Sequence, residues 1–428
     1  MTGIRGALRA AYQQTRAGFS SLSGSPRDLY IIFAVKVLES YNYFSLSRSM
    51  TLYLTEEFGI SDYRAGTLYG LWGTLLTAYG FLLGGAIDIL GVKLSLILCF
   101  LLNIGSRFVM ASTNSPWLML VMLFGPNTIA GALGVPVMTI GVKRFTHENN
   151  RGFAFSLFYS LMNVAALAQG MLMDVFRLGL KHGFNLPSFG EHSLLNSGFR
   201  MFLASGAIVS VEETLLEHGT AAEGLGGMLV ARKRLHDDAQ LSSSSSEHGS
   251  PSKVKLRGKL AAGLEAVKAV LASRGFWKYM CMCVFTVNLK SIFRHLDATL
   301  PKMQLRAFGC DTPIGLIYSI NPAMIVLLVP VVGAMTTGFQ HFDMIHLGGY
   351  ISALSPFWIV AFNTEWSTAL FVAMLSLGEA VWSPRWYDYS MSIAPEGREG
   401  VFTALASAPL FAAMLPTGVP SVDWNSSP

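Results

Sequence analysis

The chain has few charged residues for its length. Asp, Glu, Lys and Arg make up 13% of its 428 residues, whereas about 25% is usual in a soluble domain. Hydrophobic residues reach 52%, and they fall in blocks of roughly 18 residues or more, long enough to cross about 30 Å of hydrocarbon. The composition excludes an ordinary soluble protein. It predicts an integral, multi-pass protein of the plasma membrane or of an organelle membrane.

The sequence also lacks the motifs of common catalytic sites. Its four cysteines have no metal-ligand spacing. Nucleophile elbows, HExxH pairs and phosphate-binding loops do not occur. We therefore expect no enzyme activity, no metal and no cofactor. The net charge of +5 comes from basic loops and tails and gives no reason to expect a nucleic acid partner.

The apolar blocks predict ten long membrane spans and one short one. The long spans are expected at 29–54, 66–87, 92–111, 116–141, 152–173, 276–298, 314–337, 344–362, 366–389 and 400–418. The stretch 199–211 covers only about 20 Å at 1.5 Å per residue, and Glu212 and Glu213 follow it. We interpret it as a sixth span that is truncated or partly interfacial.

Positive charge predicts the orientation and the division into domains. Residues 1–28, the loops that hold Lys93 and Lys143, and the connector 212–275 are basic, which places them in the cytoplasm. The basic N-terminal segment also fits an organelle transit peptide. The expected domains are a basic cytoplasmic tail over 1–28, an N-terminal helical bundle over 29–211, a cytoplasmic linker over 212–275, a C-terminal helical bundle over 276–418 and a polar tail over 419–428.

Six spans, a cytoplasmic linker and five further spans are typical of a two-domain secondary transporter. Such folds place the substrate near the middle of the membrane, between two related halves. The sequence thus predicts an all-α polytopic protein made of two pseudo-symmetric helical bundles.

A short motif after the second span supports this prediction. Gly84, Asp88, Gly91 and Lys93 have the spacing G-x3-D-x2-G-x-K. This resembles the signature of the major facilitator superfamily, which lies between its second and third helices. The resemblance implies that the glycines let two helices approach closely, while Asp88 and Lys93 latch the cytoplasmic side. We therefore place Asp88, Gly91 and Lys93 among the gating residues.

Three spans are similar to the proton-coupled oligopeptide transporter family within that superfamily. The segment 155–165 resembles the pattern F-x2-FY-x3-N-x-G, and 378–384 reads Gly-Glu-x3-Ser-Pro. The first span resembles the E-x2-ERF-x-YY helix, although Lys36 and Ser40 replace its first glutamate and its arginine. The fourth span has no lysine to pair with Glu379. The family also has a twelfth helix, so we expect about 11 spans here, with the twelfth missing or truncated.

Polar residues inside the predicted spans are the candidates for binding solute or protons. Lys36 and Glu39 are three apart on one helical face and can pair at the depth of a central cavity. Glu379 is a carboxyl group in an apolar span, a position that favours a proton carrier. Tyr43 and Asn163 are the remaining candidates, as hydrogen-bonding groups.

The candidates for an outer gate lie near the outer ends of two helices. Arg48 ends the first span, and Arg294 and Asp297 end the seventh at a similar depth. We expect Arg48 and Asp297 to pair at a wet, exposed rim. Anchoring of these side chains at the membrane surface is an equally open alternative.

The sequence therefore predicts secondary-active transport of a small polar solute by alternating access, with proton symport as the favoured form. One alternative is a uniporter of a metabolite or anion. Another is a shortened, transport-dead receptor-like or regulatory protein. The expected partners are a small-molecule solute, protons and the lipid bilayer, with the protein as a monomer.

Overall fold

The described part of the protein is almost entirely helical. The computed structural model describes residues 2–181, 197–213, 272, 274–336 and 339–393, and no strand occurs among them. The predicted all-α class is confirmed. The expected span at 400–418, the tail at 419–428 and most of the linker lie outside the described residues. The helices are α1 (Thr2–Leu22), α2 (Arg27–Phe58), α3 (Asp62–Ser112), α4 (Pro116–Met122), α5 (Thr128–Arg144), α6 (Glu148–Asp174), a helix over 198–213, α9 (Arg274–Ala298), α10 (Leu300–Phe308), α11 (Ile314–Met335), α12 (His341–Leu354), α13 (Phe357–Ala361) and α14 (Glu365–Ile393).

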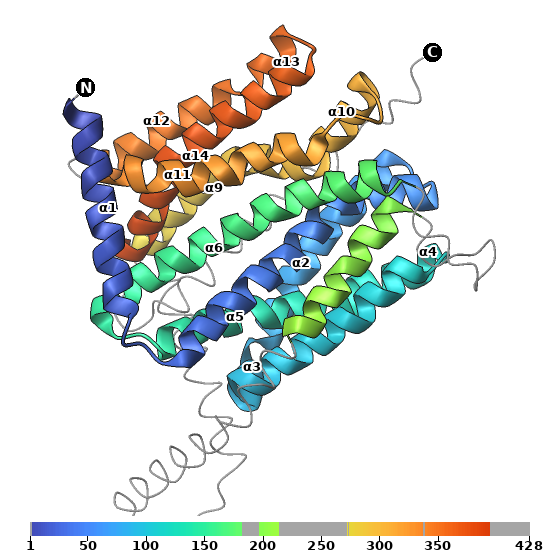
Figure 1. Ribbon diagram of the computed structural model, residues 1–428, viewed down its shortest axis with the longest axis horizontal. Coiled ribbons are helices and arrows are strands. Elements are labelled where there is room, and N and C mark those ends of the chain that lie inside the picture. Colours follow the sequence, from blue (N-terminus) through green and yellow to red (C-terminus); the bar gives the residue numbers. More distant parts are fainter. Residues whose placement is uncertain (1, 182–196, 214–271, 273, 337–338, 394–428) are drawn as a thin grey trace, which may run out of the picture.

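Two groups of helices lie side by side (Figure 1). The N-terminal half, in blue and green, contains α2 to α6 and the helix over 198–213, and the C-terminal half, in yellow and orange, contains α9 to α14. Short π-helical turns at Leu123–Asn127 and Val175–Gly179 join α4 to α5 and extend α6. We call the end of the molecule that holds Arg27 the basic end, and the opposite end, which holds Phe58, the distal end.

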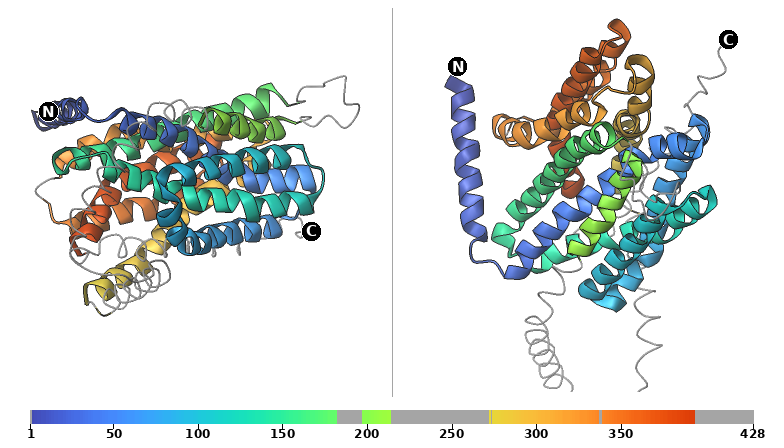
Figure 2. Two further views of the ribbon diagram at one scale, coloured as in Figure 1. Left: turned by 90° about the horizontal axis from the view of Figure 1, so that it is seen from below. Right: turned by 45° about the vertical axis from the view of Figure 1, so that its right-hand side comes forward.

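Helix α1 lies at the edge of the molecule rather than in either half (Figure 2). It contacts α6 through Phe19, whose ring meets that of Phe153 edge-on at 5.2 Å between centroids. The N-terminal tail predicted from the sequence is thus largely helical.

Local signals set both ends of α2. Pro26 precedes the helix, because its ring fixes φ and it has no N–H to leave unbonded. Gly59 ends it in the left-handed conformation, with φ at 61°. The N–H groups of Gly59 and Ile60 then bond back to the carbonyls of Thr55 and Leu54 at 3.1 and 3.2 Å. These signals produce a helix of 32 residues, longer than the span expected at 29–54.

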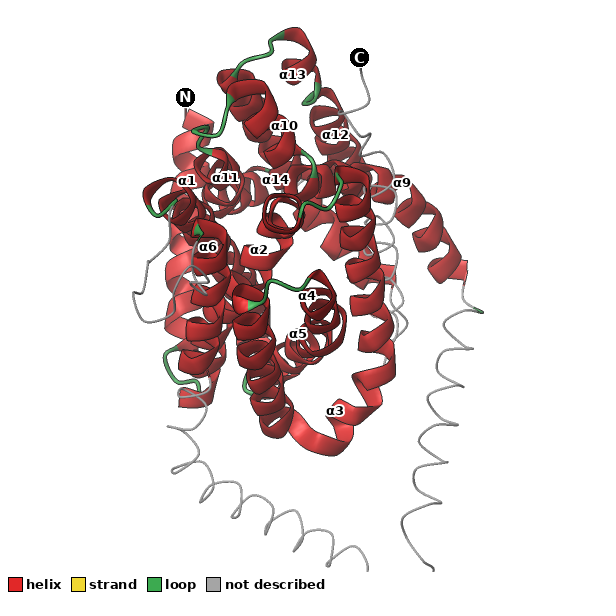
Figure 3. Cartoon of the chain, turned by 90° about the vertical axis from the view of Figure 1, so that its right-hand side faces the viewer, coloured by secondary structure: helices red, strands yellow, loops and turns green. Residues whose placement is uncertain are grey.

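Helix α3 runs without a break from Asp62 to Ser112, but it turns back on itself. The hydroxyl of Tyr69 lies 3.3 Å from Ser47, and the hydroxyl of Tyr53 donates to Met110 at 2.6 Å. Ser47 and Tyr53 are only about 9 Å apart along α2, whereas a straight helix would separate Tyr69 from Met110 by about 60 Å. Figure 3 shows the turn at the lower end of α3. Its two legs correspond to the spans expected at 66–87 and 92–111.

Five described segments are long and apolar enough to cross a membrane. They are Leu94–Ser112, Pro116–Arg144, Asn149–Gly179, Ile314–Gly333 and His341–Ala361. Each corresponds to a span expected from the sequence. Helices α2 and α14 are as long, but polar and charged side chains lower their mean hydropathy.

The helix over 198–213 belongs to the interior of the N-terminal half. Phe202 and Leu203 are buried at 1% and 0% exposure, and Asn42 of α2 donates to Ser210 at 2.8 Å. Arg200 also pairs with Glu57 at 2.8 Å. The described part of the predicted sixth span, expected to be truncated or partly interfacial, is thus a helix whose polar side chains bond to α2 and to the end of α3.

In the C-terminal half, small residues let α12 and α14 pack closely. A Cβ atom on Gly348 would lie 2.6 Å from the carbonyl oxygen of Gly378 and 2.8 Å from the Cβ of Trp382. Trp382 and Trp386 fill the core beside this contact, each at 2% exposure. The close approach fixes α14, the helix that carries Glu379.

This packing predicts the effect of a single methyl group. Gly348→Ala forces α12 and α14 apart and should lower the free energy of unfolding by about 1–3 kcal/mol, the usual range for overpacking. Gly349→Ala is the matched control, since its Cβ would meet only Leu289, at 4.0 Å. Thermal unfolding in detergent micelles measures both. Equal melting temperatures for the two variants would contradict the close packing.

Candidate functional site

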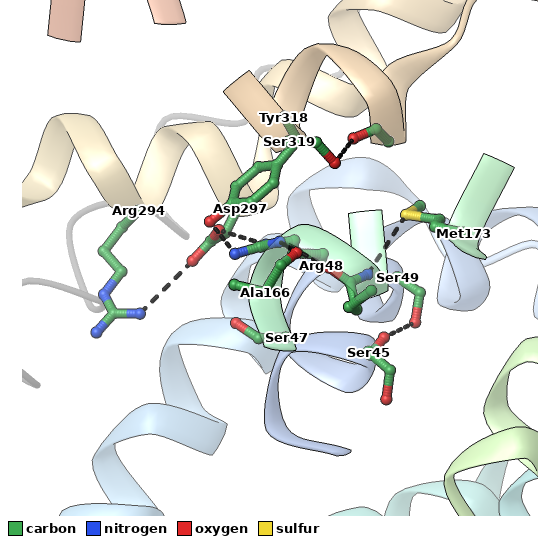
Figure 4. Close-up of polar contacts among 12 residues, drawn as sticks. Ser45, Ser47, Arg48, Ser49, Ala166, Met173, Arg294, Asp297, Tyr318 and Ser319 are labelled. Carbon is green, nitrogen blue, oxygen red and sulfur yellow. Dashed lines mark hydrogen bonds and ion pairs between the residues drawn. The ribbon is translucent and has the colours of Figure 1, made fainter. Parts of the chain in front are cut away.

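The side chain of Arg48 joins the two halves. It is buried, with 2% of its surface exposed. Its Nε lies 3.3 Å from Oδ1 of Asp297 on α9, and its Nη1 lies 2.6 Å from Oε1 of Gln169 on α6. Nη2 donates to the hydroxyl of Tyr318 on α11. Figure 4 shows the guanidinium beside Asp297 and Tyr318. One cation on α2 thus bonds to a helix of its own half and to two helices of the other.

Asp297 lies between two guanidinium groups. Its Oδ2 is 3.6 Å from Nη1 of Arg294, one turn earlier on α9. Arg294 interacts electrostatically with Tyr43 of α2, whose ring stacks on Trp72 at 5.7 Å between centroids. The outer-gate candidates Arg48, Arg294 and Asp297 therefore form one connected group, and Tyr43, a candidate for binding solute or protons, interacts with it electrostatically.

The pair is not at an exposed rim, and that expectation is wrong. The side chains of Arg48 and Asp297 are only 3% and 11% exposed. Gln169 and Tyr318 cover the pair, and the ring of Phe44 lies 4.6 Å from the guanidinium carbon. Removing one partner of a buried pair costs about 3–5 kcal/mol, whereas exposed pairs contribute about 0–1 kcal/mol.

A second ion-pair group joins the halves at the distal end. Asp62, at the start of α3, lies 2.9 Å from Nζ of Lys302 on α10 and also contacts Arg306. Burial acts to raise the pKa of Asp62, but the hydrogen bond and charge of Lys302, with Arg306, hold that pKa below its usual value. Because this pKa is lowered, the Asp62 carboxylate stays charged and keeps the contact at pH values within and above the ordinary titration range of Asp. The contact is lost only as the pH falls below that range.

A third group of contacts joins α6 to α11. The carboxylate of Asp174 accepts from the backbone N–H of Leu316 at 2.8 Å, and Arg177 donates to the carbonyls of Cys310 and Thr312. The backbones approach so closely that a Cβ on Gly170 would lie 2.7 Å from the carbonyl oxygen of Gly315. The three groups of contacts together hold the halves closed at the distal end.

Two other predicted residues form an ion pair inside the N-terminal half. Nζ of Lys36 lies 3.2 Å from Oε2 of Glu39, and both side chains are about nine-tenths or more buried. The ammonium group also lies 4.9 Å from the ring centroid of Phe158 on α6. Asn163 donates to the carbonyl of Tyr159 on its own helix at 3.1 Å.

Glu379 lies in the C-terminal half and does not contact that pair. Its Oε2 accepts from Nδ2 of Asn321 on α11 at 2.9 Å, and Asn321 also donates to Ser376 at 3.0 Å. The carboxylate interacts electrostatically with Lys290 and with Asp297. A change in the charge of Glu379, the proton-carrier candidate, therefore acts on Asp297, the carboxylate that pairs with Arg48.

Sequence reasoning missed several buried charged residues in the N-terminal half, among them Arg107 and Glu213. Arg107 on α3 is 2% exposed, and Glu213 is fully buried at the end of the last described helix of that half. A lone arginine inside a predicted span is a signal that marks Arg107. Glu213 carried no such signal, because it follows the apolar run and resembles the start of a loop.

The motif residues Asp88, Gly91 and Lys93 lie where α3 turns back, and their backbone is helical. Their side chains lie outside what the structure describes. Within the described ranges, no group of three His, Cys, Asp or Glu side chains is arranged to hold a metal ion.

Comparison with known proteins shows what part of the chain resembles. Residues 32–177 match the model of the Major Facilitator Superfamily. The predicted resemblance to that superfamily is confirmed, and the apolar spans make this an integral, multi-pass membrane protein.

Within that class, the chain is similar to peptide transporters. It is 28% identical to "Dipeptide and tripeptide permease A" of Edwardsiella piscicida over 33% of this chain and 29% of that protein. It is 27% identical to the protein of the same name from Cronobacter turicensis, over 39% of this chain and 34% of that protein. The aligned region thus spans about a third of the length of these curated relatives.

Solved structures extend the likeness in fold to most of the chain. A peptide transporter POT in complex with sulfate superposes with a TM-score of 0.68 at 15% identity, covering 94% of this chain and 91% of that one. A POT family transporter in complex with 5-aminolevulinic acid gives 0.66 at 16% identity, covering 92% and 90%. At these identities the likeness shows the fold alone.

The buried pair makes a testable prediction about stability. Arg48→Asp or Asp297→Arg alone places like charges together and should lower the free energy of unfolding by about 3–5 kcal/mol. Combining them should restore part of that loss, but not all, because Arg294 then faces a cation. Thermal unfolding in micelles measures the three variants.

The matched control is the ion pair of Lys181 and Asp311, in which Nζ lies 2.5 Å from Oδ1. Its side chains are 45% and 86% exposed. Its single reversals should change stability by about 0–1 kcal/mol. A double Arg48 and Asp297 reversal no more stable than the worse single would contradict direct pairing.

Proposed function

We propose that the protein is a secondary-active transporter that moves a small peptide or peptide-like solute by alternating access, driven by protons. The observation that carries this proposal is the closure of the two halves at the distal end around Arg48 and Asp297. Such contacts must form and break in a transporter whose halves rock about a site between them.

The orientation of the protein in the membrane determines which side of it is closed in this structure. We infer from the positive-inside rule that the basic end faces the cytoplasm. The distal end then faces outward, and the contacts of Arg48, Asp62 and Asp174 close the outer side. On this account, the halves separate at the distal end to take up solute from outside.

Proton coupling is assigned to Glu379. Its carboxylate lies in an apolar helix with the Asn321 amide as donor and with Lys290 within electrostatic range. Protonation removes the negative charge next to Asp297 and Lys290. This change alters the electrostatic balance of the outer gate, which links proton binding to opening.

The solute class rests on the printed names of the relatives, which are dipeptide and tripeptide permeases. The Lys36–Glu39 pair offers both an ammonium and a carboxylate group to a zwitterionic molecule. A uniporter of a metabolite or anion is the competing function, in which Glu379 binds solute without carrying a proton.

Replacing one carboxyl group separates these functions. Glu379→Gln should abolish uptake of alanyl-alanine driven by a pH gradient in proteoliposomes, since glutamine cannot exchange a proton. Exchange of labelled for unlabelled dipeptide across the same membranes should continue. Uptake by the wild type should also acidify the vesicle interior.

Glu365→Gln is the control for this test, because it changes an acid of the same helix at its distal end, beside Thr312. It should accumulate dipeptide as the wild type does. Undiminished gradient-driven accumulation by Glu379→Gln would remove that residue from coupling. Absence of dipeptide uptake and exchange by the wild type would overturn the proposed solute class.

A further inference from the structure

A second buried carboxyl group lies in the N-terminal half. Glu213 ends the described helix over 198–213 and is 0% exposed. The polar side chains of Ser210 and Asn42 lie close enough to act on its charge, but among the described residues no donor meets the distance and angle of a hydrogen bond to either of its oxygens. A buried carboxyl group without a donor is rare in proteins and points to a ligand or a proton.

Arg107 is a buried cation that interacts electrostatically with Glu213. Its guanidinium, 2% exposed, donates to the carbonyl of Asn42 and to Oγ of Ser45, the latter at 3.2 Å. Its Nε has no hydrogen-bond partner, and no carboxylate of the described residues lies within 4.0 Å of it. Gly206 leaves the space for this arrangement, since a Cβ there would lie 2.7 Å from Oδ1 of Asn42.

The charges around Glu213 come from two helices. Lys36 and Glu39 on α2 neutralise each other as an ion pair, and α3 contributes Arg107 and the thiol of Cys99. Arg107 interacts electrostatically with both Glu213 and Glu39. Glu213 therefore interacts with one ion pair whose charges cancel, Lys36 with Glu39, and with one cation, Arg107, that has no carboxylate partner among the described residues.

We propose that Glu213 is a reversible proton-binding residue of the N-terminal half, acting beside Glu379 in the C-terminal half. In the bound form one O–H bond exists on the carboxyl group, and no other bond changes. In the released form the carboxylate takes the free Nε of Arg107 as its counter-charge. This role deepens the proposed function and rests on it: two protons, one in each half, accompany each solute molecule.

Infrared difference spectroscopy on the full chain in lipid vesicles tests proton binding without any solute. Protonated carboxyl groups show a carbonyl stretch that carboxylates lack. A pH titration of the wild type should show a component of this band that is lost in Glu213→Gln. Glu212→Gln is the matched control, because that neighbour is exposed and its loss should leave the component unchanged.

Glu213→Asp guards against misfolding, since it keeps a carboxyl group and should keep the band at a shifted position. If Glu213→Gln leaves every component of the titrating band unchanged, the residue binds no proton and the inference is overturned. This result stands whether or not the protein transports dipeptides.

A transport measurement then tests coupling. Under a gradient of about one pH unit, Glu213→Gln should accumulate alanyl-alanine about tenfold less than the wild type, since one proton moving down that gradient corresponds to about a tenfold ratio. An unchanged ratio would overturn the coupling role. A wild type that neither takes up nor exchanges dipeptide would instead count against the proposed function, while the infrared result still decides whether Glu213 binds a proton.

Discussion

A guanidinium group buried between two helical bundles constrains the rest of this structure. Arg48 cannot be left without partners in an apolar interior, so the surrounding helices supply a carboxylate, an amide oxygen and a phenol from both halves. Asp297 must then stay close to it. The small residues Gly170 and Gly315 let α6 and α11 approach each other closely beside Gln169 and Tyr318, the other two partners of Arg48. Closure of the distal end is thus tied to one cation.

In the proposed transport cycle, the burial of Arg48 and Asp297 favours two states of the gate, one closed and one open. An exposed pair would exchange one water-mediated contact for another at little cost, about 0–1 kcal/mol. A buried pair separates favourably only when water or new partners reach both ions at once. In the proposed transport cycle, the halves open by moving as bodies, which brings water to Arg48 and Asp297 together. Glu379, in the electric field of Asp297, is placed to bias that equilibrium when it gains or loses a proton.

Helical periodicity predicted much of this arrangement and missed the rest for a physical reason. The i, i+3 spacing of Lys36 and Glu39 was enough to pair them, and depth along two helices brought Arg48 to Asp297. Depth does not say which neighbour covers a side chain, so the burial of that pair came only from the fold. The burial of Glu213 was not predicted, because the sequence does not distinguish a helix that continues past its apolar residues from a helix that ends with them. Substrate identity was not predictable, because a charged pair fits many solutes.

The distance between the outer ends of the halves tests the central claim most directly. Spin labels at Tyr63→Cys and Trp366→Cys, which are 47% and 81% exposed in the native chain, report it by double electron–electron resonance in lipid nanodiscs. The native cysteines are replaced first. The account predicts one short distance when Asp297 is present and an added, longer population when Asp297→Asn leaves Arg48 without its carboxylate. An identical distribution in both proteins would contradict the claim that this buried pair holds the halves closed.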